Sequence, residues 1–185
     1  MEFAPINLTG KTALVTGGSK GIGYCMALGL AKVGADVVVV SRNLDEGRAV
    51  AKEICTLGRR SLAISCDVTS KNAVESMVEQ AVQEMGSIDI LINNAGMNIR
   101  KAVVELEESD FDTVINTNLK GVFLVGQAVG KQMIAQKKGG KIVNVASVMG
   151  GIAIPMLNSY CASKGGVIQM TKVWALEWVE HGINV

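Results

Sequence analysis

Residues 12–23 read TALVTGGSKGIG, an apolar run that leads directly into a cluster of glycines. Residues 12–16 are typical of a short buried strand, and the pattern of residues 24–33 is typical of a helix. Gly17, Gly21 and Gly23 lie between these two segments. A strand that turns through glycines into a helix N-terminus leaves backbone N–H groups free around a concavity, which favours an anion such as a dinucleotide pyrophosphate. We therefore predict a phosphate-binding turn between the first strand and the first helix.

The spacing of these glycines is Gly17-x-x-x-Gly21-x-Gly23, which differs from the common dinucleotide fingerprint G-x-G-x-x-G. A plain tight turn can use the same residues. The position of the glycines between a predicted strand and a predicted helix nevertheless favours phosphate binding over an ordinary turn.

Beyond this stretch, strand-like and helix-like segments alternate along the chain. The predicted strands cover residues 12–16, 36–41, 61–65, 88–93 and 141–147, and the predicted helices cover residues 21–33, 45–57, 71–85, 109–138 (with a break near Asn118) and 159–181. The strands are almost entirely apolar, so we expect helices on both faces of the sheet. This order predicts right-handed crossovers and an α/β fold with a Rossmann-like, doubly wound parallel sheet. We expect a single domain over residues 1–185.

The composition excludes several classes of protein. The chain has 185 residues, 49% of them apolar, and a net charge of +1, so it suits one domain with a sizeable core and not a nucleic-acid-binding tail. No apolar run approaches the roughly 18 residues of a membrane span, and residues 1–5 lack the features of a secretion signal. Cys25, Cys55, Cys66 and Cys161 form no C-x-x-C pair, and one histidine provides no zinc set. We expect a cytoplasmic protein without a metal, a membrane or a nucleic-acid partner.

The residues after the second predicted strand indicate which cofactor would bind. An NAD site usually has Asp or Glu about 20 residues beyond the glycines, to accept from the ribose 2′-hydroxyl. Here the sequence is Ser41-Arg42-Asn43, without a carboxylate. A guanidinium at Arg42 can instead pair with a 2′-phosphate, and Lys20 can add a second positive charge. Two surface cations are the alternative, but we predict NADP(H) rather than NAD(H).

Further polar residues follow the later strands. The run NNAG, residues 93–96, falls where ligands bind in open α/β sheets, although an ordinary turn also uses Asn and Gly. The fifth predicted strand ends at Ser147. Tyr160 and Lys164 lie at i and i+4 on a predicted helix, so they share a face. An ammonium group close to the phenol would lower the pKa of the tyrosine toward the working range of a proton donor, whereas the alternative is a surface pair.

Taken together, these motifs resemble the classical group of the short-chain dehydrogenase/reductase family. The matching pieces are TGGSKGIG at residues 16–23, Asp67-Val68, NNAG at residues 93–96, Asn118, Ser147 and the Y-x-x-x-K motif of residues 160–164. The run VINTNLKGVF, residues 114–123, resembles 3-oxoacyl-(acyl carrier protein) reductases. The run NNAGMNIRK, residues 93–101, resembles gluconate and deoxygluconate dehydrogenases. Its basic pair, Arg100 and Lys101, can meet a sugar-acid carboxylate or merely solvate a loop.

The resemblance implies roles for individual residues. In that family, the residue matching Tyr160 is the general acid/base, and the one matching Ser147 hydrogen-bonds the same carbonyl oxygen. The residue matching Lys164 lowers the pKa of the tyrosine and holds the nicotinamide ribose, and the one matching Asn118 anchors a water in a proton relay. The residues implied to bind the cofactor are Gly17, Ser19, Lys20, Gly21, Ile22, Gly23, Ser41, Arg42, Asp67, Val68, Asn94, Ala95, Gly96, Tyr160 and Lys164.

The implied function is an NADP(H)-dependent oxidoreductase that interconverts a ketone and a secondary alcohol, with a 3-oxoacyl or sugar-acid type of substrate. Residues 182–185 resemble the opening of the sixth strand, and family members continue beyond it with a substrate lid and a seventh strand. We therefore expect a C-terminally incomplete domain, and the alternative function is a non-catalytic dinucleotide-binding or dimerisation module. We also expect a homodimer or homotetramer, associated through the apolar helical residues 121–126 and 167–176.

Overall fold

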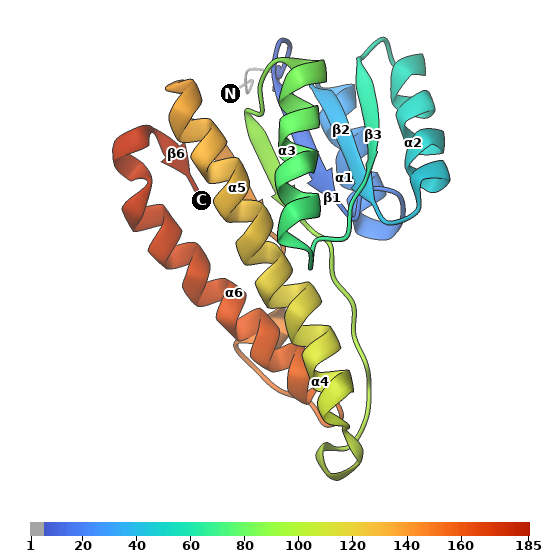
Figure 1. Ribbon diagram of the computed structural model, residues 1–185, viewed down its shortest axis with the longest axis vertical. Helices are drawn as coiled ribbons and strands as arrows, with labels where there is room; N and C mark the ends of the chain where they lie inside the picture. The colour runs from blue at the N-terminus through green and yellow to red at the C-terminus, as the bar shows by residue number, and fades with distance from the viewer. Residues whose placement is uncertain (1–5) are drawn as a thin grey trace, which may run out of the picture.

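The computed structural model describes residues 6–185 (Figure 1). These residues build one six-stranded sheet in the order β3-β2-β1-β4-β5-β6. Every neighbouring pair of strands is parallel. Strands β2 and β3 are added on one side of β1, and β4, β5 and β6 are added on its other side, as in Rossmann-like folds. The predicted fold class is therefore confirmed. The strands are β1 (Thr12–Thr16), β2 (Asp36–Ser41), β3 (Ser61–Ser65), β4 (Ile90–Asn93), β5 (Gly140–Asn144) and β6 (Ile183–Asn184).

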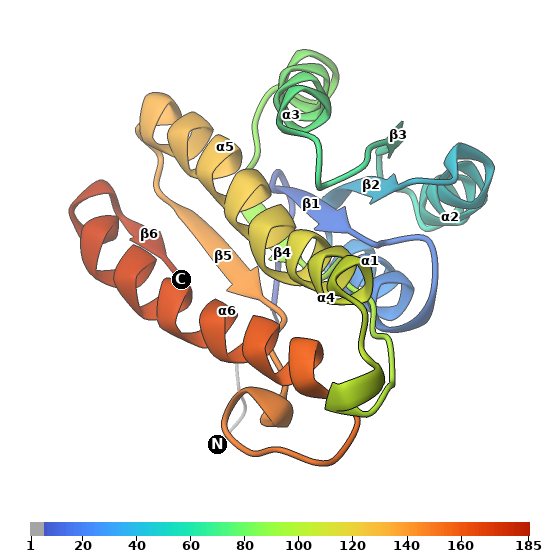
Figure 2. The ribbon, with the colours of Figure 1, turned by 60° about the horizontal axis from the view of Figure 1, so that its bottom comes forward.

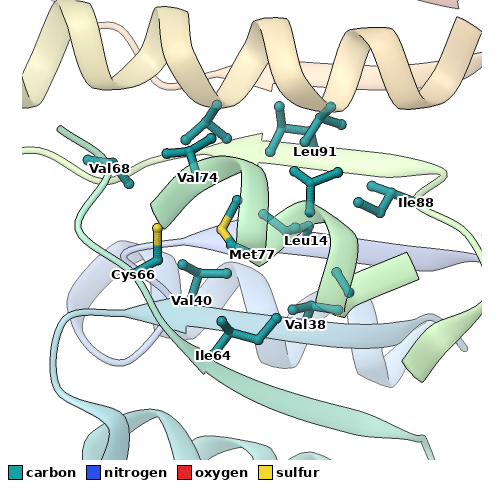
Figure 3. Close-up of a cluster of buried hydrophobic side chains, with 14 of the residues drawn as sticks. Leu14, Val38, Val40, Ile64, Cys66, Val68, Val74, Met77, Ile88 and Leu91 are labelled. Atoms are coloured by element: carbon teal, nitrogen blue, oxygen red, sulfur yellow. The ribbon is translucent and has the colours of Figure 1, made fainter. Parts of the chain in front are cut away.

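The central strands are buried because successive apolar side chains enter opposite faces of the sheet. On β1, Leu14 joins a core cluster with Met77 and Leu91, which Figure 3 shows between the sheet and the helices above it. Its neighbours Ala13 and Val15 join a second cluster on the other face. The expectation that both faces are covered holds for this part of the sheet.

The helices are distributed unequally over the two faces (Figure 2). Side chains of α1 and α2 pack in the second cluster, whereas those of α3 and α5 pack in the first. Helix α6 lies alongside α5. Trp174 of α6 lies so close to Gly126 that a Cβ there would be 2.3 Å from the ring. The helices are α1 (Gly21–Lys32), α2 (Leu44–Thr56), α3 (Lys71–Met85), α4 (Glu108–Ile115), α5 (Gly121–Gln136) and α6 (Asn158–Glu177).

One face of β5 departs from the expected coverage. Ile142 is 3% exposed within the first cluster, but its neighbour Val143, which points to the opposite face, is 48% exposed. Within the described residues, the helices therefore leave the apolar side chain of Val143 partly uncovered.

The predicted break near Asn118 is confirmed. Helices α4 and α5 are separated by a π-helical turn, Asn116–Lys120. π-Helical turns often occur at functional positions, where they redirect a side chain. Here the turn holds Asn118 in the interior, with no exposed surface.

Several predicted boundaries were wrong by a few residues. The fourth strand begins at Ile90 and not at residue 88, and the fifth ends at Asn144 and not at residue 147. The last helix ends at Glu177 and is followed by a 3-10 turn, Val179–His181. Within residues 6–185, no helix combines the length and the apolar character that crossing a bilayer requires. Residues 1–5, on which the expectation about a secretion signal rests, lie outside the described residues.

Candidate active site

A cleft with a volume of about 430 Å³ opens at the carboxyl ends of β1, β2, β3 and β4. This is where open α/β sheets bind ligands, at the point where the strand order reverses. Glu46, Met97 and Thr117 also line it. The structure therefore brings together nearly all the residues expected to contact a cofactor. Those that line the cleft are Gly17, Ser19, Lys20, Ile22, Gly23, Ser41, Arg42, Asp67, Val68, Asn94, Ala95 and Gly96.

The glycine turn fits a pyrophosphate. A Cβ at Gly23 would lie 2.1 Å from the carbonyl oxygen of Gly17, so only glycine allows this close approach. Gly17 and Gly21 have φ angles of +64° and +57°, in the left-handed region that favours glycine. Helix α1 has no side-chain cap and no acidic residue in its first turn. Its N-terminal N–H groups therefore remain available to an anion.

Thr16 joins the glycine turn to the NNAG turn after β4. Its buried Oγ1 accepts from the backbone N–H groups of Asn94, at 2.9 Å, and Ala95, at 3.0 Å. The side-chain amide of Asn94 donates in return to the carbonyl oxygens of Thr16, at 3.0 Å, and Gly17, at 3.3 Å. This role of Thr16 was not predicted, although a threonine at the end of an otherwise apolar strand is a visible signal.

The far end of the cleft, which is lined by the residues after β2 and β3, carries charges of both signs. Lys20 and Arg42 lie in it, as predicted, but so do Asp67 and Glu46. The Nζ atom of Lys20 is 3.5 Å from Oε2 of Glu46. Glu46 was missed because it stands in the first turn of α2 and not directly after the strand. Backbone and side-chain hydrogen bonds from Thr69 lower the pKa of Asp67, and the charge of Arg42 adds a smaller effect.

Tyr160 and Lys164 share a face of α6, as predicted. Lys164 is 4% exposed, and its Nζ donates to the carbonyl oxygen of Val145 at 2.6 Å. The same atom lies 5.7 Å from the centre of the Tyr160 ring. Burial lowers the pKa of Lys164. The pair therefore faces the carboxyl end of β5 and is not a surface pair.

Asn118 connects this pair to the cleft. Its side-chain amide donates at 2.8 Å to the carbonyl oxygen of Met97, which lines the cleft, and at 3.2 Å to Oγ of Ser163. Ser163 donates in turn to the carbonyl oxygen of Tyr160 at 2.7 Å. Met97 and Ser163 were not predicted, because nothing in the local sequence marks them as long-range partners of Asn118.

Ser147 follows β5, two residues after Val145, whose carbonyl oxygen accepts from Lys164. It caps the 3-10 helix Val148–Gly150, and its Oγ accepts from the N–H of Met149 at 3.2 Å. A Cβ at Gly150 would be 2.9 Å from the carbonyl oxygen of Lys164, so this short helix packs tightly against α6. Tyr160, Lys164 and Gly21 do not line the cleft itself. Over residues 6–185, no group of three or more His, Cys, Asp or Glu side chains is arranged to hold a metal ion.

Comparisons with known proteins add a second line of observation. The family model for the short chain dehydrogenase matches residues 11–185. The 2-dehydro-3-deoxy-D-gluconate 5-dehydrogenase of Escherichia coli (strain K12) is 44% identical over 188 residues, covering 100% of this chain and 72% of that protein. A 3-oxoacyl-[acyl-carrier-protein] reductase FabG of Staphylococcus epidermidis is 42% identical over 176 residues, covering 95% of this chain and 72% of that protein. The crystal structure of an NAD⁺-bound xylitol dehydrogenase matches with a TM-score of 0.93 at 36% identity, covering 96% of this chain and 68% of that one.

This arrangement points to an oxidoreductase that uses a nicotinamide dinucleotide and acts on a small molecule. Since the family model spans residues 11–185, the chain belongs to the short-chain dehydrogenase/reductase family, in its classical group. The two kinds of relative that the sequence runs indicated, gluconate-type dehydrogenases and 3-oxoacyl reductases, are both among its homologues. This prediction is confirmed.

Proposed function

We propose that the protein is an NADP(H)-dependent oxidoreductase that interconverts a ketone and a secondary alcohol, with Tyr160 as the acid/base. The observation that carries the proposal is the link from the dinucleotide-sized cleft, through Met97 and Asn118, to the helix that holds Tyr160 and Lys164. The loop after β4, which Thr16 and Asn94 join to the glycine turn, and the helix that carries Tyr160 are thereby connected by hydrogen bonds.

The cofactor supplies the hydride when it is bound. Reduction of a ketone places negative charge on its oxygen, so hydrogen-bond donors aimed at that oxygen stabilise the transition state. The phenol of Tyr160 gives this oxygen a proton, and the hydroxyl of Ser147 donates a hydrogen bond to it. Lys164 is buried beside Tyr160, with its Nζ 5.7 Å from the centre of the phenol ring, and would hold the nicotinamide ribose. Asn118 fixes the helix that carries both groups.

We propose NADP(H) because Lys20 and Arg42 lie at the far end of the cleft and no carboxylate follows β2 directly. The residues that would hold the 2′-phosphate are these two cations, with Ser41 beside them. Asp67 and Val68 would border the adenine. The NAD⁺-bound structure among the neighbours makes NAD(H) the competing choice.

For the substrate we propose a 3-oxoacyl compound or a sugar acid. The 44% identity to a deoxygluconate dehydrogenase supports the sugar acid. Lys101 is already paired with Asp110, whose carboxylate lies 2.5 Å away and raises the pKa of the lysine. Arg100 is exposed, so it is the basic residue of this pair that would meet a substrate carboxylate.

The test is NADPH oxidation with a panel of 5-keto sugar acids and 3-oxoacyl thioesters, together with cofactor binding by fluorescence. We expect turnover with one substrate class, and we expect Tyr160→Phe to abolish turnover while NADPH still binds. Binding of NADPH without turnover of any ketone would instead support a non-catalytic dinucleotide-binding module. Turnover that survives Tyr160→Phe would contradict the assignment of the acid/base.

We propose that residues 1–185 form a single domain and that copies associate through α5 and α6, where Phe123, Val173 and Leu176 are 39%, 49% and 78% exposed. We also propose a cytoplasmic location, since Cys25, Cys55, Cys66 and Cys161 are free thiols. Sedimentation of a dimer or tetramer is expected, and a stable monomer would contradict the association.

A further inference from the structure

Glu46 is an acidic side chain of the cleft that contacts the glycine turn. Its Oε2 accepts a hydrogen bond from Oγ of Ser19 at 3.1 Å and lies 3.5 Å from Nζ of Lys20. The far end of the cleft thus holds two cations, Lys20 and Arg42, and two carboxylates, Glu46 and Asp67. Its formal charge is balanced, although the sequence directly after β2 shows only the arginine.

The first turn of α2 fixes the direction of Glu46. Asn43 caps this helix by accepting from the N–H groups of Asp45, at 3.1 Å, and Glu46, at 3.3 Å. In a capping box, the glutamate at this position would reach back to the N–H of the cap residue. Here its carboxylate instead crosses to Ser19 and Lys20. Gly47 is buried, and a Cβ there would be 3.3 Å from Oγ of Ser41, so the helix cannot rotate away without losing this close packing.

A 2′-phosphate and Glu46 therefore compete for the same cation. Lys20 can pair fully with a 2′-phosphate only after it leaves the carboxylate, and the carboxylate then stands close to a second negative group. A cofactor with a 2′-hydroxyl leaves the pair between Lys20 and Glu46 intact. A carboxylate can also accept from such a hydroxyl, whereas it repels a phosphate.

We propose that Glu46 is a specificity-determining residue that holds Lys20 and Ser19 and thereby reduces the preference for NADPH over NADH. This inference rests on the proposed dinucleotide site, and it makes the protein accept both cofactors to a degree that Lys20 and Arg42 alone would not allow. The side chains of Lys20 and Glu46 are 80% and 40% exposed, so solvent weakens the pair and the effect is modest.

The experiment measures dissociation constants by calorimetry for NADPH, NADH, adenosine 2′,5′-bisphosphate and 5′-AMP. The two shorter probes isolate the adenosine end, so the readout does not depend on turnover. Glu46→Gln keeps the shape of the side chain and removes its charge. We expect it to tighten binding of NADPH and of the bisphosphate about threefold to tenfold, and to change NADH and 5′-AMP less than about twofold.

Asp45→Asn is the matched control. This substitution removes the same charge from the same helical turn, but Asp45 pairs with Arg48 and does not line the cleft. We expect it to change none of the four affinities more than about twofold, because the Asp45 carboxylate is 89% exposed and already paired with Arg48. An equal gain in both variants would show a general charge effect and overturn the proposal.

The role of Lys20 is tested by a double-mutant cycle. In a Lys20→Met background, Glu46→Gln should give a smaller gain in NADPH affinity, since there is no longer a cation to release. An undiminished gain would overturn the step through Lys20.

The outcomes separate this inference from the proposed function. If NADPH binds but Glu46→Gln leaves its affinity unchanged, the inference fails and the dinucleotide site stands. Weaker NADH binding with unchanged NADPH binding would also overturn it, because Glu46 would then be a ribose acceptor only. If none of the four probes binds any variant, the dinucleotide site fails and the inference fails with it.

Discussion

Asn118 and Met97 exchange two hydrogen bonds, as two paired peptide groups would. The N–H of Met97 donates to Oδ1 of Asn118, and Nδ2 of Asn118 donates to the carbonyl oxygen of Met97, both at 2.8 Å. Met97 lies on the loop that lines the cleft, and Asn118 lies in the π-helical turn between α4 and α5. Since Asn118 also donates to Ser163, its side chain ties the loop that lines the cleft to α6.

Asn118→Ala should destabilise the protein by roughly 2–4 kcal/mol, because it leaves the part-buried N–H and carbonyl groups of Met97 without partners. Urea unfolding measures this difference. The control is Asn98→Ala on the same loop, where the side chain is exposed and a change of less than about 0.5 kcal/mol is expected. Similar effects of the two substitutions would contradict the role of Asn118 in tying the two regions together.

Gly23→Ala should abolish nucleotide binding and destabilise the fold. Its Cβ would lie 2.1 Å from the carbonyl oxygen of Gly17 and 2.5 Å from Nδ2 of Asn94, so the turn must open. Such crowding costs about 1–3 kcal/mol or more. Gly29→Ala is the control in the same helix, because a Cβ there meets nothing within 4 Å. We expect that substitution to stabilise the protein by about 0.5–1 kcal/mol, and nucleotide binding should be unchanged.

The strands β1, β2 and β3 were predicted to the residue because each is an apolar run bounded by turn residues. The end of β5 was not, although Val145 and Ala146 continue the strand-like pattern. The strand stops at Asn144 because its partner β4 ends at Asn93. After that residue, the hydroxyl of Thr16 binds the backbone of Asn94 and Ala95 and turns the chain away. Local propensity carries no information about where a neighbouring strand ends.

The candidate site also combines features that the local sequence predicts with features that depend on packing between distant segments. Motifs with fixed spacing, such as Gly17 to Gly23 and Tyr160 to Lys164, predict which residues lie together, because a turn or a helix sets their geometry. The contact of Glu46 with Ser19 and Lys20 depends on how α2 packs against the glycine turn. No periodicity in the sequence encodes that packing, so the carboxylate at the far end of the cleft was missed.

Two serines of α6 should respond oppositely to truncation. Ser159 is fully buried, and its Oγ has no hydrogen-bond partner among the described residues. Ser159→Ala removes an unsatisfied hydroxyl and should be neutral or stabilising by up to about 1 kcal/mol. Ser163→Ala breaks the bonds to Asn118 and Tyr160, and should cost roughly 1–3 kcal/mol. Thermal unfolding of both variants measures this, and a larger loss at Ser159 than at Ser163 would refute the assignment.

Arg42→Asp should weaken NADPH binding by about tenfold to a hundredfold, as expected for loss of a charge-assisted bond to phosphate. NADH, which has no 2′-phosphate, should lose far less affinity. Fluorescence titration with both cofactors gives the ratio. Arg48→Asp is the control. It reverses the same charge nearby, but Arg48 pairs with Asp45 and does not line the cleft. Equal losses for NADPH and NADH in Arg42→Asp would sink the assignment of this residue to the 2′-phosphate.

The buried ammonium of Lys164 should make stability depend on pH. Burial lowers the pKa of Lys164 below its ordinary value of 10.5. Below the folded-state pKa, both folded and unfolded chains carry the proton, so folding bears the full cost of burying a charge. Between that pKa and 10.5, the unfolded chain holds the proton and the folded chain releases it. The free energy of unfolding must therefore rise with pH across this interval.

The measurement is urea unfolding of the wild type and of Lys164→Met at several pH values from about 7 to 10. The stability of the wild type relative to Lys164→Met should increase with pH, because only the wild type carries this proton. Lys172→Met removes an exposed lysine from the same helix, and its stability relative to the wild type should stay constant. A relative stability that falls as pH rises would mean that the charged form of Lys164 is favoured by its surroundings, against the effect of burial.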